Sequence, residues 1–261
     1  MVSYDIIGSG SKAVAIVEIS PGQEKNKIEI AKKIMKNNKI VKSVLQKASE
    51  RKGEFRKREL KLIAGDEDTE VLHQEFGYIL KVDPRKTYFS PRESTERQKI
   101  AEQAKPNETV LVMFGGISVI AIAIAKKQPK VSKIYSVEIN PDAHKYALEN
   151  IRMNKLSHKI TPILSDVKEA CKGFYNKCDR VAMPLPLDAG KFLDMAVKCL
   201  KPKGIIHFYA VGNEVDLFSK ALEMIDERLK KLNKSYVVMT KRKVLPYGPR
   251  RWKVCIDFMV E

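Results

Sequence analysis

The stretch "VLVMFGGISVIAIAIAKK", Val110–Lys127, decides which kind of fold the chain adopts. Its first sixteen residues carry no charge and are mostly apolar, so it reads either as a membrane helix or as a buried strand followed by a helix. A helix that crosses a bilayer needs about 20 apolar residues. This run is shorter, and it contains Gly115, Gly116 and Ser118. We therefore expect no membrane span but a strand through Phe114, a turn at the glycines and a helix from about Ser118.

The sequence after Ser94 alternates between helical and extended patterns. Such alternation predicts a mainly parallel sheet with helices on both faces, a Rossmann-like α/β fold, and two final strands in succession predict an antiparallel edge. The expected helices span 94–105, 141–154, 188–200 and 213–232, and the expected strands span 109–114, 134–139, 160–166, 178–185, 204–211, 235–244 and 251–260.

The first 86 residues show a different, shorter pattern. A strand is expected in 12–20, a helix with its apolar positions between Ile28 and Met35, a strand in 41–49, and a hairpin in 70–83 that turns near Gly77. A basic loop, 50–60, separates the second strand from the hairpin. We therefore expect two domains, a small α/β domain over residues 1–86 and the Rossmann-like domain over residues 87–261.

The charge of the chain is strongly positive. There are 49 Lys and Arg against 32 Asp and Glu, a formal net charge of +17, and between Lys25 and Lys61 we count fourteen basic residues against four acidic ones. A lysine-rich surface of a heat-adapted protein is one explanation, but in such surfaces Lys and Glu are both abundant. Here the acids do not match the bases, which favours a polyanionic partner.

The cysteines and the N-terminus exclude several other classes. Cys171, Cys178, Cys199 and Cys255 have the spacing of neither a zinc site nor a redox pair, so we expect buried thiols and no metal. The N-terminus lacks the charged, apolar and small-residue succession of a signal peptide. A cytoplasmic, monomeric protein is expected.

Three residues stand at the expected carboxyl ends of the strands. Glu138 lies twenty-two positions after Gly116, a spacing that suits a carboxylate binding the ribose of a nucleotide-like ligand at the glycine turn. Asp166 either accepts a hydrogen bond from an adenine amino group or caps the following helix. Pro184, in "MPLP", stiffens the wall of the pocket that a substrate would approach.

The string "YFSPRESTER", Tyr88–Arg97, connects the two expected domains. A Ser or Thr cap is expected to open the helix at Ser94, with Arg92 before the helix and Glu96 in its first turn. The simplest role of Glu96 is that of a first-turn acid favoured by the helix dipole.

Six strings, taken in order, resemble the archaeal and eukaryotic type of tRNA (guanine-N1)-methyltransferase, which modifies the guanosine 3′ of the anticodon, position 37. They are "GEFRKRELKLIAGD", "YFSPRESTER", "VEINPDAHKYALENIRMNK", "CDRVAMPLP", "GIIHFY" and "PYGPRRWKVCIDF", and the similarity runs from about Tyr4 to the C-terminus. This resemblance implies a class I S-adenosylmethionine-dependent methyltransferase fold, a small RNA-facing N-terminal domain, S-adenosylmethionine as cofactor and tRNA as partner.

The resemblance also implies roles for individual residues. Glu96 corresponds to the general base, Arg92 to an arginine on the substrate side, and Arg56 to the arginine that contacts the guanine carbonyl. Guanine N1 carries a proton at neutral pH, so methylation there needs a base, and the charge that develops on O6 needs a donor. We assign cofactor binding to Phe114, Gly115, Gly116, Glu138, Asp166 and Pro184, and RNA binding to Tyr88, Arg97, Lys57, Arg58 and Arg250.

The chain departs from the family pattern in its glycine turn, where Val112 replaces a common Asp and "FGGISV" replaces "FAGVGP". The family also commonly has a further N-terminal domain that touches the tRNA elbow, which we expect this chain to lack. Two rival functions stay open. One is the wybutosine-pathway enzyme that transfers the aminocarboxypropyl group of the same cofactor, and the other is a catalytically silent RNA-binding homologue. The "PRESTER" motif favours methyl transfer.

Overall fold

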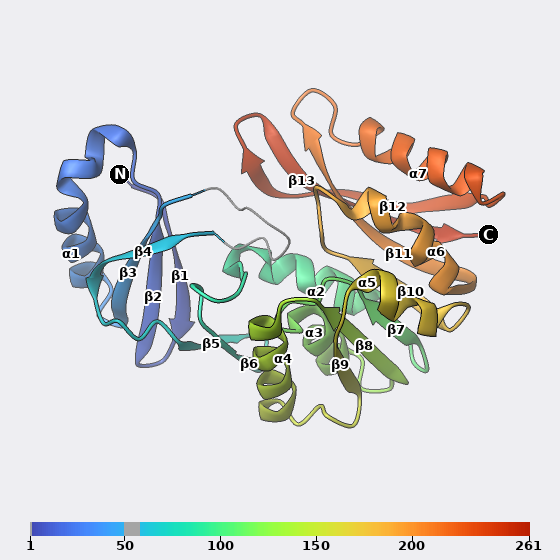
Figure 1. Cartoon of the computed structure of the whole chain (residues 1–261), viewed down its shortest axis with the longest axis horizontal. Helices are drawn as coiled ribbons and strands as arrows, with labels where there is room; N and C mark the ends of the chain where they lie inside the picture. Colours follow the sequence, from blue (N-terminus) through green and yellow to red (C-terminus); the bar gives the residue numbers. More distant parts are fainter. Residues whose placement is uncertain (1, 50–57) are drawn as a thin grey trace.

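The computed structural model describes residues 2–49 and 58–261. The N-terminal part is a four-stranded sheet in the order β1-β2-β3-β4 (Figure 1). Its strands are β1 Tyr4–Ser9, β2 Lys12–Val17, β3 Val41–Lys47 and β4 Leu60–Gly65. Strands β2 and β3 run parallel because the connection between them contains the 3-10 turn Pro21–Asn26 and helix α1, Lys27–Asn37.

The two faces of this sheet pack against different partners. In β2, Ala13, Ala15 and Val17 pack against α1, whereas Val14 belongs to the large core that continues into the second part of the chain. This split follows from the alternation of side chains along a strand. The strand, helix and strand that the sequence predicts here are confirmed, while β1 and β4 were not predicted.

The predicted hairpin is confirmed and forms a sheet of its own. It consists of β5 Val71–Glu75 and β6 Tyr78–Val82, and its turn at Phe76 and Gly77 has positive φ at both residues. Gly8 of β1 donates its backbone N–H to His73 Nδ1 at 3.1 Å. On the other side, Asn150 Oδ1 accepts the N–H of Lys81 at 2.6 Å. The hairpin is therefore bonded to both parts of the chain, and the division after residue 86 stays a prediction.

The second part contains a seven-stranded sheet in the order β12-β13-β11-β10-β7-β8-β9 (Figure 1). Strands β7 to β11 are parallel, and β13 and β12 add an antiparallel edge, as predicted. The strands are β7 Thr109–Val112, β8 Lys133–Glu138, β9 Ile160–Leu164, β10 Cys178–Met183, β11 Leu200–Asn213, β12 Tyr236–Gly248 and β13 Arg251–Val260.

Helices cover both faces of this sheet. On one face, α2, α3 and α4 share a core with Ala182 and Tyr209, and on the other, α5, α6 and α7 share a core with Val181 and Phe208. The helices are α2 Ser94–Gln103, α3 Val119–Lys127, α4 Pro141–Met153, α5 Val167–Ala170, α6 Leu193–Cys199 and α7 Ser219–Lys231. Short 3-10 turns span Pro91–Glu93, Cys171–Phe174 and Ala189–Phe192.

Several predicted boundaries were wrong for local reasons. The last long helix begins at Ser219, not at Asn213, because β11 continues to Asn213 and Asp216 Oδ1 accepts the N–H of Ser219 at 3.1 Å. Strand β7 ends at Val112 because Phe114 has a left-handed φ of 58°. The predicted Ser or Thr cap of α2 is also wrong: a 3-10 turn precedes the helix, and the residue at the cap, Glu93, makes no side-chain capping bond.

The opening stretch is a strand, a glycine turn and a helix, as predicted. Within the residues that the structure describes, no helix is long and apolar enough to cross a membrane. Cys171, Cys178, Cys199 and Cys255 are free and buried, which confirms the predicted thiols. Over 2–49 and 58–261, no group of three or more His, Cys, Asp or Glu is placed to hold a metal ion.

Candidate functional site

The glycine turn follows β7 and lies at the carboxyl ends of the parallel strands. Phe114, Gly116 and Ser118 all have positive φ, of 58°, 55° and 62°, so the turn is tightly wound. A Cβ at Gly115 would lie 2.1 Å from Ser136 Oγ on β8, so close packing between the turn and the sheet requires glycine there. A Cβ at Gly116 would meet no atom within 4 Å. The turn therefore faces open space at Gly116.

Glu138 borders this open space. Its Oε2 accepts the N–H of Gly116 at 2.7 Å and its Oε1 accepts the N–H of Asn140 at 2.8 Å. Burial raises the pKa of Glu138, and these backbone donors oppose that rise. Since each carboxylate oxygen can accept more than one hydrogen bond, Glu138 still has acceptor capacity for a ligand's hydroxyl groups.

The other residues assigned to cofactor binding lie at the same edge. The Phe114 ring packs edge-on against Phe192, with centroids 5.0 Å apart. Asp166 Oδ1 accepts the N–H of Lys168 at 2.8 Å and caps α5, so the capping role is the one observed. Pro184 follows the last residue of β10. The structure thus brings the predicted cofactor residues together at the carboxyl ends of the parallel strands.

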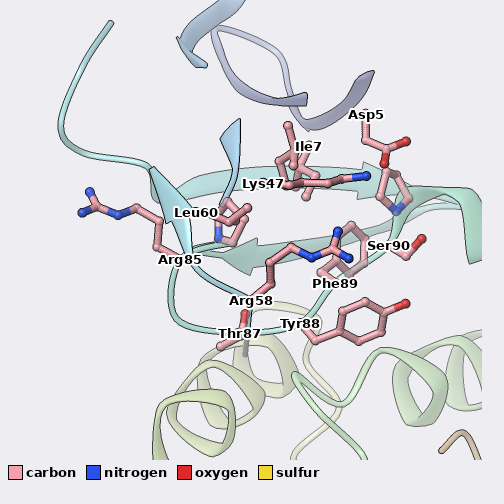
Figure 2. Close-up of a pocket in the computed structure, with 13 residues that line it drawn as sticks. Asp5, Ile7, Lys47, Arg58, Leu60, Arg85, Thr87, Tyr88, Phe89 and Ser90 are labelled. Atoms are coloured by element: carbon pink, nitrogen blue, oxygen red, sulfur yellow. The ribbon is translucent and has the colours of Figure 1, made fainter. Parts of the chain in front are cut away.

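A cavity of about 90 Å³ lies between the N-terminal sheet and the segment that leads into α2 (Figure 2). Its lining includes the basic residues Lys47, Arg58 and Arg85 and the acidic residue Asp5. Tyr88, whose exposed fraction is 41%, also lines it. Tyr88 donates its hydroxyl to Glu93 at 2.6 Å. Two of the residues assigned to RNA, Arg58 and Tyr88, therefore line one cavity.

Three other residues predicted to bind RNA or take part in catalysis do not line this cavity: Arg92, Arg97 and Arg250. Arg92 is ion-paired with Asp5 of the N-terminal sheet. Arg97 is buried, with both ends of its guanidinium bonded to Glu75 at 2.7 and 2.6 Å, so it lies inside the protein and not on an RNA-facing surface. Arg250 is exposed in the turn between β12 and β13. Arg56 and Lys57 lie outside the described residues.

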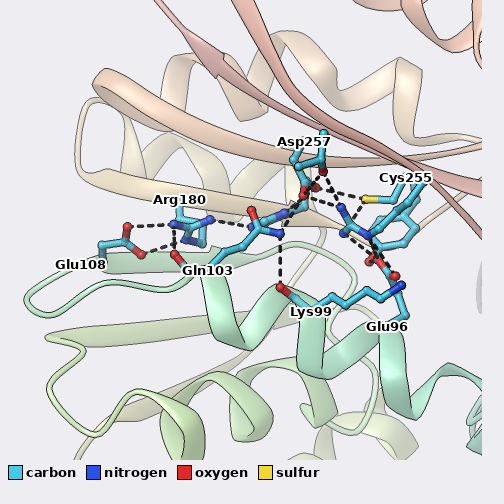
Figure 3. Close-up of polar contacts among 11 residues, drawn as sticks. Glu96, Lys99, Gln103, Glu108, Arg180, Cys255 and Asp257 are labelled. Atoms are coloured by element: carbon cyan, nitrogen blue, oxygen red, sulfur yellow. Dashed lines mark hydrogen bonds and ion pairs between the residues drawn. The ribbon is translucent and has the colours of Figure 1, made fainter.

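Glu96 is buried, with an exposed fraction of 6%, and its carboxylate faces the sheet (Figure 3). Glu96 Oε1 accepts the hydroxyl of Tyr209 at 2.6 Å and NH2 of Arg242 at 2.7 Å. Tyr209 follows Phe208, which pairs with the last residue of β10, Met183. Glu96 therefore lies near the carboxyl end of β10, the sheet end that also carries the glycine turn.

The contacts of Glu96 extend into a buried charged network (Figure 3). Arg242 also pairs with Asp257, and Asp257 Oδ1 lies 2.7 Å from His207 Nδ1. Arg180 lies 2.8 Å from His207 Nε2, and since arginine can only donate, His207 Nε2 accepts and its Nδ1–H donates to Asp257. Burial lowers the pKa of His207, which keeps the ring neutral.

Sequence reasoning missed Arg242, Tyr209, Asp257 and Lys253. Lys253 Nζ bonds to Glu93 at 2.7 Å and lies 4.7 Å from the centroid of the Tyr209 ring. One signal was present in the sequence: Arg251, Lys253, Cys255 and Asp257 recur with a period of two in a strand whose other residues are apolar. That period places a row of polar side chains on one face of a buried strand. Such a row is unusual unless hydrogen-bond or ion-pair partners face it.

Two family descriptions match the chain. Residues 71–238 match the TRM5/TYW2 methyltransferase domain, and residues 2–69 match the TYW2 N-terminal domain.

Individual relatives support the same family. The tRNA (guanine(37)-N(1))-methyltransferase Trm5b of Pyrococcus abyssi is 40% identical over 99% of this chain and 74% of its own length. The tRNA(Phe) (4-demethylwyosine(37)-C(7)) aminocarboxypropyltransferase of Methanocaldococcus jannaschii is 33% identical over 88% of this chain and 90% of its own. The solved complex of aTrm5 and tRNALeu superposes with a TM-score of 0.86 at 37% identity, covering 99% of this chain and 72% of that one. Other relatives were solved in complex with adenosine, AdoMet and MeSAdo.

Proposed function

Because the chain belongs to the TRM5/TYW2 methyltransferase family, we propose that it methylates N1 of guanosine 37 in tRNA, with S-adenosylmethionine as the methyl donor. The observation that carries this proposal is the 40% identity to a Trm5b enzyme over 99% of the chain. The relative solved with tRNALeu supports tRNA as the partner. The basic character of the chain, +17, suits that partner.

The carboxyl edge of the sheet fits the cofactor. S-adenosylmethionine supplies an electrophilic methyl group when it is bound. Gly116 leaves open space beside the turn, and Glu138 stands next to it as an acceptor for ribose hydroxyls. The departure of "FGGISV" from the usual family turn therefore keeps the two features that nucleoside binding needs, an open turn and an acceptor.

Glu96 is our candidate for the general base. It is a buried carboxylate near the carboxyl ends of the parallel strands, where we place the cofactor. Its bonds run to strands of the sheet, not to the start of its own helix. Guanine N1 must lose a proton during methylation, so a carboxylate at this place has a chemical task. A structural ion pair with Arg242 is the competing role, and a mutation separates the two.

The proposed function is tested with two labels in S-adenosylmethionine, tritium in the methyl group and carbon-14 in the carboxyl group. A tRNA transcript with guanosine at position 37 should take up tritium only, and a transcript with adenosine there should take up neither. The aminocarboxypropyltransferase relative and the match to the TYW2 N-terminal domain favour a second candidate function. Uptake of carbon-14 by tRNA carrying 4-demethylwyosine would support that candidate instead.

Glu96→Gln tests the general base. The amide cannot take the N1 proton, so the single-turnover rate of methyl transfer should fall roughly 10²- to 10⁴-fold while tRNA and cofactor still bind.

The matched control for this variant is Glu75→Gln, which removes a different buried carboxylate that is also held by an arginine, in this case Arg97 of α2. Its single-turnover rate at pH 7 should stay within a few-fold of the wild type. A Glu96→Gln variant with the wild-type rate would leave Glu96 with a structural role.

A further inference from the structure

We propose that Tyr209 and Arg242 are positioning residues that hold Glu96 mainly through one oxygen, Oε1, and leave Oε2 with the capacity to accept the proton of the substrate. This inference rests on the proposed function and deepens it. It names the oxygen that acts as the base and the residues that present it.

The two oxygens of Glu96 have unequal surroundings. Oε1 accepts three contacts, from Tyr209 Oη at 2.6 Å, Arg242 NH2 at 2.7 Å and Arg242 Nε at 2.9 Å. From residues 2–49 and 58–261, Oε2 accepts only the shared Nε contact, at 3.0 Å. A carboxylate oxygen has about two lone-pair sites. Oε1 is therefore saturated, whereas Oε2 keeps acceptor capacity.

The donors on Oε1 are themselves fixed. Arg242 is also bonded to Asp257, and its NH1 donates to Thr240 Oγ1 at 3.0 Å. Burial alone would lower the pKa of Arg242, but its bond to Glu96 and the charge of Asp257 raise it, so the guanidinium stays charged. Burial and the Glu96 carboxylate raise the pKa of Tyr209, so its hydroxyl stays a donor. Neither group can take the proton in place of Oε2.

Asp257 keeps the charge of Arg242 balanced when Glu96 takes up a proton. Burial alone would raise the pKa of Asp257, but His207 and Arg242 hold it far below its usual value, so Asp257 stays ionised. With His207 neutral, Glu96, Arg242 and Asp257 together carry one net negative charge. Once Glu96 is neutral, Arg242 is still balanced by Asp257, so no buried charge is left unpaired.

The proton step then follows. The N1–H proton passes to Glu96 Oε2 while N1 forms a bond to the methyl carbon, and the methyl–sulfur bond breaks with its electron pair on sulfur. The products are N1-methylguanosine, the neutral carboxyl group of Glu96 and the thioether form of the cofactor. Throughout, Oε1 can keep its bond from Tyr209, so the side chain does not need to turn.

The test uses single-turnover methyl transfer at pH 7. Tyr209→Phe keeps the ring and removes the donor to Oε1, so the rate should fall about tenfold, because the carboxylate loses the hydrogen bond that orients it. Tyr146→Phe is the matched control, since Tyr146 of α4 likewise donates its hydroxyl to a carboxylate, that of Glu70, at 2.7 Å. Its rate should match the wild type.

Two further measurements separate positioning from general stability. In a Glu96→Gln background, Tyr209→Phe should have no further effect on the rate, since it acts through the missing carboxylate. Arg242→Lys should retain more activity than Arg242→Met, because lysine keeps the charge beside Glu96 and Asp257.

A Tyr209→Phe variant with the wild-type single-turnover rate would overturn the inference, and so would rate losses that persist in the Glu96→Gln background. The proposed function is judged separately, by whether the wild type methylates RNA with guanosine at position 37 at all.

Discussion

At the scale of the residue, Glu138 connects the glycine turn with the segment that follows β8. Its two oxygens hold the N–H groups of Gly116 and Asn140, so its removal loosens the turn and, in the cofactor site proposed above, deletes an acceptor for the ribose. We expect Glu138→Ala to weaken S-adenosylmethionine binding by roughly 1.5–3 kcal/mol, measured by calorimetric titration. Glu169→Ala, which deletes an exposed carboxylate of α5, should leave the dissociation constant unchanged. Equal constants for both variants would remove Glu138 from the cofactor site.

At the scale of the element, the ion pair of Arg97 and Glu75 joins α2 to the β5–β6 hairpin. Burial alone would raise the pKa of Glu75, but bonds from His73, Arg97 and Tyr78 lower it to about 2. A depressed carboxylate pKa stabilises the fold above its ordinary value of 4.5, and this stability is lost as pH falls through about 2.

This pair predicts a specific pH dependence. In urea unfolding, Glu75→Gln should cost about 2–3 kcal/mol at pH 7, and its difference from the wild type should shrink as pH falls from 4.5 towards 2. Glu67→Gln is the control, since that side chain is 83% exposed. A Glu75→Gln cost that stays constant with pH would show that the carboxylate charge contributes nothing.

At the scale of the whole molecule, the excess of positive charge predicts a salt-dependent affinity for tRNA. Neutralising Lys57 and Arg58 together should reduce the slope of log K against log salt by about 0.7–0.9 for each cation that contacts a phosphate. Lys230→Gln with Lys231→Gln removes the same charge from α7, on the sheet face opposite α2, and should leave the slope unchanged. Equal slopes for the two double variants would mean that the basic loop is not an RNA contact.

The sequence by itself determined the fold class, because the alternation of helices and strands depends on local patterns. Apolar periodicity identified that α/β alternation. The spacing from Gly116 to Glu138 predicts ribose binding by Glu138, which stays a prediction, and the structure adds a 2.7 Å bond between the two residues that was not predicted. Two strands escaped notice. β1 and β4 are only partly buried, and β4 begins at Leu60, the last residue of the segment read as the basic loop, so neither was recognised from an apolar run.

Only the tertiary structure decided the surroundings of the charged residues. Glu96 meets Tyr209 and Arg242, which lie 113 and 146 positions away along the chain. Arg97 was assigned to RNA binding from the sequence, yet the hairpin places Glu75 against it. The free energy of a buried charge depends on which partner the packing of distant elements supplies. No local pattern carries that information, so the sequence could name Glu96 but not the residues that hold it.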